Sequence, residues 1–141
     1  MNNYLSIITL NVNGLKAPIK RHRIAEWIRK HDPHMCCLQE AHLRTEDLHR
    51  LKVKGWKQIF QANGQEKTGV AILISDKIDF QRRAIKRDPE GHFIILKGGI
   101  HREDKHCKYI CTQHRSTQIH KENLGGLQER YSQQHSCSKG F

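Results

Sequence analysis

The first forty residues constrain the fold more than any other stretch, because two short apolar runs flank a segment with helical spacing. The turn signal Asn13-Gly14 ends the first run, and Glu40 follows the second. Between them, Pro18 suits a helix start and Asp32-Pro33 a helix end. This strand–helix–strand order predicts an α/β fold. In chain order, the apolar residues of the three segments are Leu5, Ile7, Ile8, Leu10, Val12, Ile24, Trp27, Ile28, Met35, Cys36, Cys37 and Leu38.

The stretch from residue 41 to residue 100 is rich in short runs of strand character, separated by turn signals. Asn63-Gly64 and Asp88–Gly91 have turn composition, and Thr45-Glu46-Asp47 is a plausible start for a second helix. We therefore expect a mixed β-sheet with flanking helices. The expected strands lie around residues 56–60, 70–74, 79–85 and 93–96.

The composition changes near Ile100. Residues 101–141 are rich in His, Gln and Ser, contain no valine and offer few large apolar side chains. The sequence therefore predicts an ordered domain over residues 1–100 and an irregular, poorly ordered tail over residues 101–141.

The net charge of +11 favours polyanionic partners, of which nucleic acid is the commonest inside a cell. A generic basic surface is the alternative. Lys20, Arg21 and Arg23, on the expected helix, are candidate phosphate contacts, unless they only form its solvated face. No apolar run is long enough to span a bilayer and no secretory signal is visible, so we expect an intracellular protein, in the nucleus or cytoplasm.

The five cysteines are odd in number, which, in an intracellular protein, predicts free thiols rather than a disulfide framework. Cys36 and Cys37 lie in an apolar run and should be small core residues. A zinc cluster is an alternative for the later cysteines, but their spacing is poor for a structural site. Its candidate ligands would be His106, Cys107, Cys111, His114, His135 and Cys137.

Two polar residues lie at the ends of the expected buried strands. Asn11 is near the end of the first strand, and Glu40 follows the second. A carboxylate beside an amide from a neighbouring strand can hold a magnesium ion, which prefers oxygen ligands and keeps several waters. Such an ion polarises a phosphate oxygen. The alternative is that Asn11 caps a turn and Glu40 is an ordinary exposed carboxylate.

The segments around these residues resemble the endonuclease domain in the second open reading frame of LINE retrotransposons. That domain belongs to the endonuclease/exonuclease/phosphatase family, with exonuclease III and the apurinic endonucleases. The resemblance covers nearly all of residues 5–100. It rests on Thr9–Leu15, Cys36–Glu40, Leu51–Trp56, Gln61–Gly64, Gly69–Lys77 and Lys86–His92.

The resemblance implies a four-layered α/β sandwich that hydrolyses phosphodiester bonds with magnesium. It implies that Asn11 positions phosphate and metal, that Glu40 binds the metal, and that Gln39 supports them. In a retrotransposon the implied reaction is nicking of target DNA, which leaves an end that primes reverse transcription. DNA is thus the expected partner.

Past residue 100 the resemblance stops. The family next requires Asn-Ile-Tyr-Ala-Pro-Asn, then Gly-Asp-Phe-Asn, a later Asp and Ser-Asp-His, and none is present. Codons chosen for Lys108–His120 and read one base further on encode Asn-Ile-Tyr-Ala-Pro-Asn-Thr-Gly-Ala-Pro-Arg-Phe, which suggests a shifted reading frame after about Asp104.

We therefore expect the N-terminal half of the family domain, inactive or weakly active because most catalytic residues are missing. A non-catalytic basic nucleic-acid binder and a translated remnant without function remain as alternatives.

Overall fold

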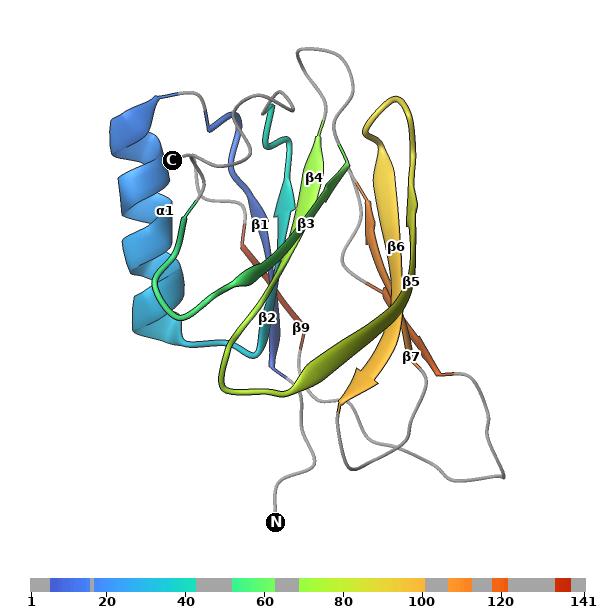
Figure 1. Ribbon diagram of the computed structural model, residues 1–141. Helices are drawn as coiled ribbons and strands as arrows, with labels where there is room; N and C mark the ends of the chain where they lie inside the picture. The colour runs from blue at the N-terminus through green and yellow to red at the C-terminus, as the bar shows by residue number, and fades with distance from the viewer. Residues whose placement is uncertain are drawn as a thin grey trace.

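Two β-sheets lie face to face, and one helix covers the outer side of the first sheet (Figure 1). The computed structural model describes residues 6–15, 17–42, 52–62, 69–100, 107–112, 118–121 and 134–137. The elements are β1 (Ile7–Asn11), α1 (Pro18–His31), β2 (Met35–Gln39), β3 (Gln58–Ala62), β4 (Val70–Ile74), β5 (Phe80–Arg87), β6 (Phe93–Ile100), β7 (Cys107–Thr112), β8 (Gln118–Lys121) and β9 (Gln134–Cys137).

The first sheet is mixed, with the order β3-β4-β2-β1-β9. β1 runs parallel to β2, with Ile7 opposite Met35 and Asn11 opposite Gln39. A parallel pair needs a crossover connection, and α1 supplies it. The expected α/β class with a mixed sheet is confirmed, and the carboxyl ends of β1 and β2 meet at one edge.

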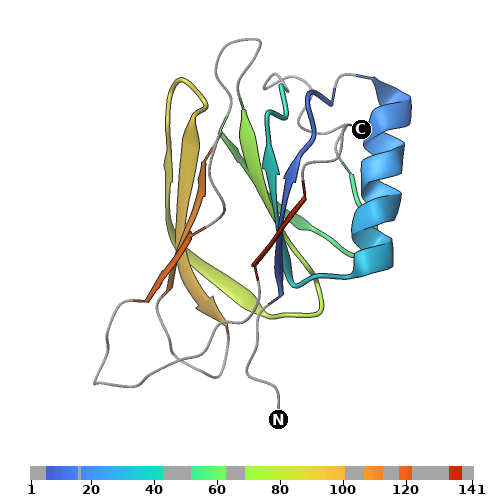
Figure 2. The ribbon, with the colours of Figure 1, turned by 180° about the vertical axis from the view of Figure 1, so that it is seen from behind.

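The strands at the centre of the first sheet bury side chains on both faces, which explains why their sequences are continuous apolar runs. One set packs under α1, the helix that lies against this face of the sheet in the 180° view of Figure 2. The other set faces the second sheet. The α1 side includes Ile8, Leu10, Ile24, Ile28, Cys36, Leu38, Ala71 and Leu73. The inter-sheet side includes Ile7, Met35, Cys37, Val70, Ile72, Ile74, Phe80, Ile94, Leu96, Cys107, Tyr109 and Cys111.

The second sheet is antiparallel, with the order β5-β6-β7-β8. The expectation of an irregular tail is wrong for β7, which pairs with β6 across the boundary placed near Ile100. Cys107, Tyr109 and Cys111 alternate into the inter-sheet core while the residues between them face outward. Their alternation is a strand pattern, but it uses cysteine and tyrosine rather than large aliphatic residues. β8 and β9 are further short strands beyond residue 100.

The expectation of free thiols is wrong for Cys37 and Cys111. Cys37 of β2 and Cys111 of β7 form a disulfide with a Cα–Cα distance of 5.9 Å. The two lie 74 positions apart in the chain, so only the packing of the two sheets brings them together. Cys36 and Cys107 lie outside this disulfide and are buried, and burial raises the pKa of the Cys36 thiol.

The expected helix start at Thr45-Glu46-Asp47 and the turn at Asn63-Gly64 lie outside the described residues. The expected strands at residues 79–85 and 93–96 correspond to β5 and β6, which extend further. Among the described residues, no helix has the length and apolar character needed to cross a membrane.

Candidate functional site

Asn11 and Glu40 lie side by side at the edge where β1 and β2 end. Asn11 is the last residue of β1, and Glu40 directly follows β2. The Asn11 side-chain amide Nδ2 donates a hydrogen bond to Glu40 Oε2. The Asn11 Oδ1 atom accepts one from the backbone N–H of Asn13 at 3.1 Å. Asn11 therefore orients the carboxylate and also shapes the turn after β1.

The loops that follow β1 and β2 stay paired beyond the strand ends. The Val12 N–H donates to Gln39 O at 3.0 Å, and the Gly14 N–H donates to Glu40 O at 2.6 Å. The Leu15 N–H then donates to Ala41 O at 2.8 Å. These bonds extend the parallel ladder through the candidate site and fix the backbone on both sides of Glu40.

Three residues of this region other than glycine have left-handed backbone conformations. The φ angles are 50° at Asn13, 53° at Glu40 and 53° at His42. Asparagine tolerates this region, whereas glutamate and histidine adopt it less often. Such conformations persist only where the surroundings enforce them, and they cluster at functional sites.

The two basic residues nearest the start of α1 contact the loop after β1. Lys20 Nζ donates to Asn13 O at 2.8 Å, and Arg21 Nη1 donates to Leu15 O at 2.9 Å. Arg23 is exposed on the same helix. Lys20 and Arg21 therefore hold the loop after β1 in place. The helical pattern of the sequence does not predict these contacts, because the partners are backbone carbonyls that precede the helix.

The second sheet reaches the candidate site through backbone and amide contacts. The Ala41 N–H donates to Gly69 O at 2.9 Å, and the Gly69 N–H donates to Gly91 O at 3.1 Å. Buried Gln39 donates through Nε2 to Thr112 O of β7 at 2.9 Å. Gln39 therefore links β2 to β7 next to Glu40, a supporting position.

His42 was not singled out by the sequence, yet it lies against the loop after β1. A Cβ placed on Gly14 would lie 3.1 Å from His42 Nδ1, so the ring packs closely on that glycine. Its Nε2 atom is buried, without a hydrogen-bond partner among the described residues. Glu40 and His42 both have left-handed backbone conformations, and no local sequence signal predicts that the His42 ring packs on Gly14.

The donor set fits magnesium only in part. Glu40 supplies a carboxylate, and magnesium in proteins is often held by one or two carboxylates with several waters. The Asn11 Oδ1 atom is engaged by the Asn13 N–H. Among the described residues, no group of three or more His, Cys, Asp or Glu side chains is arranged to hold a metal ion. Cys111 and Cys107, considered as zinc ligands, instead lie in the inter-sheet core, with Cys111 bonded to Cys37.

Comparisons with known proteins give one family and one fold. Residues 8–126 match the Endonuclease/Exonuclease/phosphatase family. An AP endonuclease from Leishmania major aligns with a TM-score of 0.64 and 17% identity over 79% of this chain and 40% of that chain. A functionally unknown conserved protein from Enterococcus faecalis V583 aligns with a TM-score of 0.57 and 17% identity over 75% and 51%. An AP endonuclease from Archaeoglobus fulgidus aligns with a TM-score of 0.50 and 23% identity over 67% and 37%.

At these identities the solved structures show the shared fold. The chain spans about half or less of their lengths, with 51% the largest of these three values.

Proposed function

The chain belongs to the Endonuclease/Exonuclease/phosphatase family, and we propose that it is the N-terminal half of a retrotransposon-type, magnesium-dependent DNA endonuclease that hydrolyses phosphodiester bonds weakly or not at all by itself. The observation that carries the proposal is the pairing of Asn11 with Glu40 at neighbouring strand ends. The retrotransposon type is supported by the sequence segments Thr9–Leu15, Cys36–Glu40 and Gly69–Lys77. DNA as the polyanionic partner agrees with the net charge of +11.

In this proposal Glu40 holds the ion and Asn11 holds Glu40. The Asn11 amide fixes one carboxylate oxygen, so the carboxylate does not have to be ordered when a cation or phosphate arrives. Lys20 and Arg21 keep the loop after Asn11 in place through its carbonyls. A bound magnesium ion would polarise a phosphate oxygen and stabilise the leaving group.

Weak or absent activity follows from the small number of groups at the site. Glu40, with Asn11 holding it, cannot both orient the attacking water and neutralise the charge that develops on the phosphate. The family segments that would bring a tyrosine, further Asp and Asn residues and a histidine are absent from the sequence. We propose that a reading-frame shift after about Asp104 removed them. A coding sequence with codons unlike those that regenerate Asn-Ile-Tyr-Ala-Pro-Asn would contradict the shift.

Two assays test this function separately. The first measures nicking of supercoiled plasmid with and without magnesium, for the wild type, Glu40→Gln and the matched control Glu26→Gln. Glu26 is an exposed glutamate of α1 that pairs with His22 at 3.1 Å and is not a candidate site residue. Any magnesium-dependent nicking should disappear in Glu40→Gln and persist in Glu26→Gln. Nicking that is unaffected by Glu40→Gln would refute the assignment.

The second assay measures metal binding without turnover, by titrating Mn²⁺ and recording its electron paramagnetic resonance signal. We expect weak binding that Glu40→Gln removes and Glu26→Gln retains. Equal binding by both variants would mean that Glu40 is an ordinary surface carboxylate.

A non-catalytic nucleic-acid binder is the second candidate function, favoured by the net charge of +11. Such a protein would bind DNA through phosphates with strong salt dependence. Its affinity would be unchanged or slightly higher in Glu40→Gln, because a negative charge is lost. A translated remnant without function would show neither nicking nor binding at physiological salt.

A further inference from the structure

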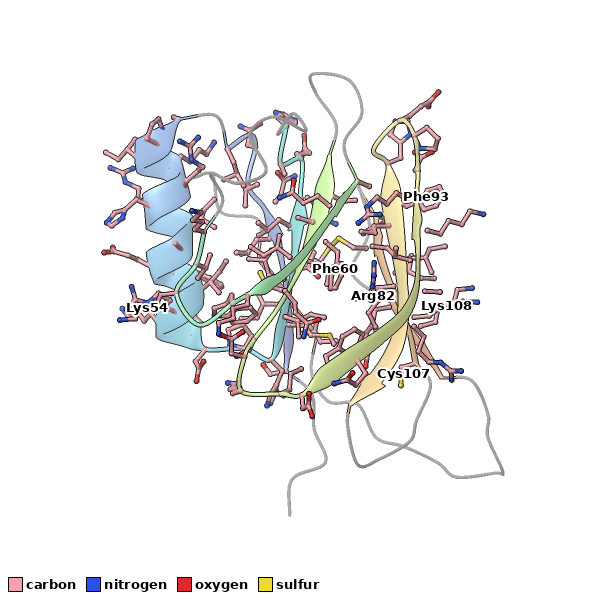
Figure 3. All side chains as sticks on the ribbon, in the orientation of Figure 1. Lys54, Phe60, Arg82, Phe93, Cys107 and Lys108 are labelled. Carbon is pink, nitrogen blue, oxygen red and sulfur yellow. A yellow bond between two sulfur atoms is a disulfide. The ribbon has the colours of Figure 1, made fainter. Side chains whose placement is uncertain are left out.

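Two links join β2 to β7 directly before the candidate site. The first is the disulfide between Cys37 and Cys111, and Figure 3 shows a yellow disulfide in the space between the two sheets. The second is the hydrogen bond of 2.9 Å from Gln39 Nε2 to Thr112 O. Cys37 and Gln39 are two positions apart on β2, so their side chains share a face, and their partners are adjacent on β7.

Gln39 connects these links to both residues of the site. It lies opposite Asn11 in the parallel pair of β1 and β2, and its backbone O accepts a hydrogen bond from the Val12 N–H at 3.0 Å. Glu40 is the next residue along the chain, and the Asn11 amide holds its carboxylate. A displacement of Gln39 therefore reaches Asn11 through the strand pair and Glu40 through the chain.

The disulfide determines how closely β7 approaches β2. Cys37 and Cys111 are 1% and 0% exposed and lie in the inter-sheet core, where side chains are closely packed. The Cys111 Sγ atom is 3.8 Å from Ala71 O and 4.0 Å from Leu38 O. Two separate thiols need more space than a bonded pair of sulfurs. Reduction therefore moves the Cys111 side chain relative to β2, and its new S–H becomes a weak donor for one of these carbonyls.

We propose that the Cys37–Cys111 disulfide makes the candidate site sensitive to redox conditions. In the oxidised chain the bond clamps β2 to β7 and, through Gln39, holds Glu40 in place. In the reduced chain the clamp is lost and Glu40 shifts. This regulation rests on the proposed function, in which Glu40 is the metal ligand. A disulfide in a protein that acts on DNA inside a cell is usually transient or redox-sensing, because thiol reductants keep most cysteines reduced there.

The reductant is a dithiol that is not part of this chain. Its thiolate attacks one sulfur of the disulfide, which breaks the S–S bond and forms a mixed disulfide, and its second thiol then releases the remaining cysteine. In total the reductant gives two electrons and two protons, so that Cys37 and Cys111 become thiols and the reductant becomes a disulfide. Because both sulfurs are buried, the attack requires β7 to open from β2.

Two other buried cysteines, Cys36 and Cys107, do not lie at this bond. Cys36 is on the opposite face of β2, under α1. Cys107 is four positions before Cys111 on β7, about 13 Å along the strand. Cys107→Ser is therefore a matched control, because it removes a buried sulfur of the same strand and leaves both links between β2 and β7 in place.

The first test records amide signals of the full chain by ¹H–¹⁵N nuclear magnetic resonance in EDTA, before and after incubation with dithiothreitol. We expect shifts of the Gln39 side-chain amide and of the backbone amides of Ala41 and Gly14, whose hydrogen bonds surround Glu40. The Ile28 amide of α1, on the other side of the first sheet, should keep its position.

Three outcomes of this test would overturn the proposal. One is that the signals around Glu40 stay unchanged in the reduced chain. Another is that all dispersed signals disappear, those of α1 included, because the bond would then hold the whole fold rather than the site. The third is that dithiothreitol does not reduce the bond in the folded chain, which alkylation of the thiols and mass spectrometry measure.

Variants separate the bond from the side chain that transmits its effect. Cys107→Ser should respond to dithiothreitol like the wild type, whereas Cys111→Ser should show the reduced positions with and without it. Gln39→Leu keeps the disulfide but removes the hydrogen bond to Thr112, so the reductant should cause little further shift at Ala41. A shift at Ala41 as large as in the wild type would refute the route through Gln39.

The second test measures Mn²⁺ binding by electron paramagnetic resonance in both redox states, after the reductant has been removed by gel filtration under argon. We expect about tenfold weaker binding by the reduced chain, within the range for groups that orient a metal ligand. Cys107→Ser should behave like the wild type, and equal affinities in the two states would overturn control of metal binding. If the oxidised wild type binds no Mn²⁺, the metal assignment of the proposed function fails, while the amide signals still decide whether the disulfide positions Glu40.

Discussion

The first sheet is covered on both faces, by α1 on one side and by the second sheet on the other, whereas the described part of the second sheet is covered on one face only. The strand sequences of the two sheets do not reveal this difference. Val70–Ile74 of β4 and the first four residues of β6, Phe93–Leu96, are both continuous apolar runs. All five residues of β4 are buried, but Phe93 and Ile95 of β6 stay partly exposed.

The burial of the first sheet fits the role proposed for its strand ends. The candidate catalytic pair lies at the ends of strands whose side chains are fixed on both faces, and a site needs that rigidity to hold its groups in place. The outer side chains of the second sheet, such as Phe93, Ile95 and Ile110, lie outside the core and are partly exposed. An apolar sequence run therefore indicates a strand, but it does not tell whether the second face is core or contact surface.

The largest expected effect contrasts one aliphatic side chain from each sheet. Leu38→Ala, at a fully buried position under α1, should lower the free energy of unfolding by about 2–5 kcal/mol, because it removes packed atoms and leaves a cavity. Ile110→Ala, on the outer face of the second sheet, should lower it by less than about 1 kcal/mol. Urea denaturation followed by circular dichroism measures both. Equal losses would mean that the outer face of the second sheet is also covered.

The disulfide between the sheets should give the next largest effect. Reducing Cys37–Cys111, whose partners lie 74 positions apart, should lower the free energy of unfolding by about 2–4 kcal/mol, because the unfolded chain regains conformational freedom. Urea denaturation with and without dithiothreitol measures this loss. Cys107→Ser keeps the disulfide and should respond to the reductant like the wild type, whereas Cys111→Ser should not respond. A wild type insensitive to reductant would show that the sheets dock without the bond.

The next comparison is between two glycines that have similar backbone angles but different surroundings, one in the loop after β1 and one in an open turn. Gly14 has φ +91° and lies against His42, whereas Gly55 has φ +90° and open space around it. Each substitution by alanine should cost about 1–2 kcal/mol for the left-handed conformation. Gly14→Ala should cost more, since its Cβ would lie 3.1 Å from the His42 ring. Thermal unfolding of the two variants measures the difference, and no difference would mean that the site loop can relax away from His42.

The smallest expected effect is a pH dependence of stability that comes from His34, the residue directly before β2. Burial lowers the pKa of His34, helped by the charge of Lys77, while Asp32 acts in the opposite direction. His34 Nδ1 accepts a hydrogen bond from the Ser6 N–H at 2.9 Å, which requires the neutral ring. Below the ordinary histidine pKa of about 6.5 the unfolded chain binds a proton that the folded chain does not. Stability is therefore full above that pH and falls as the pH drops towards the folded pKa.

The measurement is the urea midpoint of the wild type and of His34→Gln between neutral pH and mildly acidic pH. We expect the acid-induced decrease to be smaller in His34→Gln, which has no ring to titrate. The same decrease in both proteins would assign the pH dependence to other groups.

Several parts of the fold were predictable because their signals are local. Pro18 and Asp32-Pro33 delimit α1 within one residue, since proline is compatible with only a few helix positions. The apolar runs at β1, β2 and β4 were recognised because buried strands need apolar side chains on both faces. Asn11 and Glu40 were selected from their places at strand ends and from family resemblance, and the structure brings them into contact. Their catalytic role stays a prediction.

The sequence by itself determined where the early strands and α1 form and which polar residues follow them, because backbone conformation and side-chain alternation depend on near neighbours. Only the tertiary structure decided that β7 joins the second sheet, that Cys37 meets Cys111, that His42 packs on Gly14 and that Lys20 and Arg21 hold the loop after β1. Each of these contacts depends on how a turn directs the chain or on how two sheets dock. That outcome depends on packing summed over many distant residues, and no short stretch of sequence contains it.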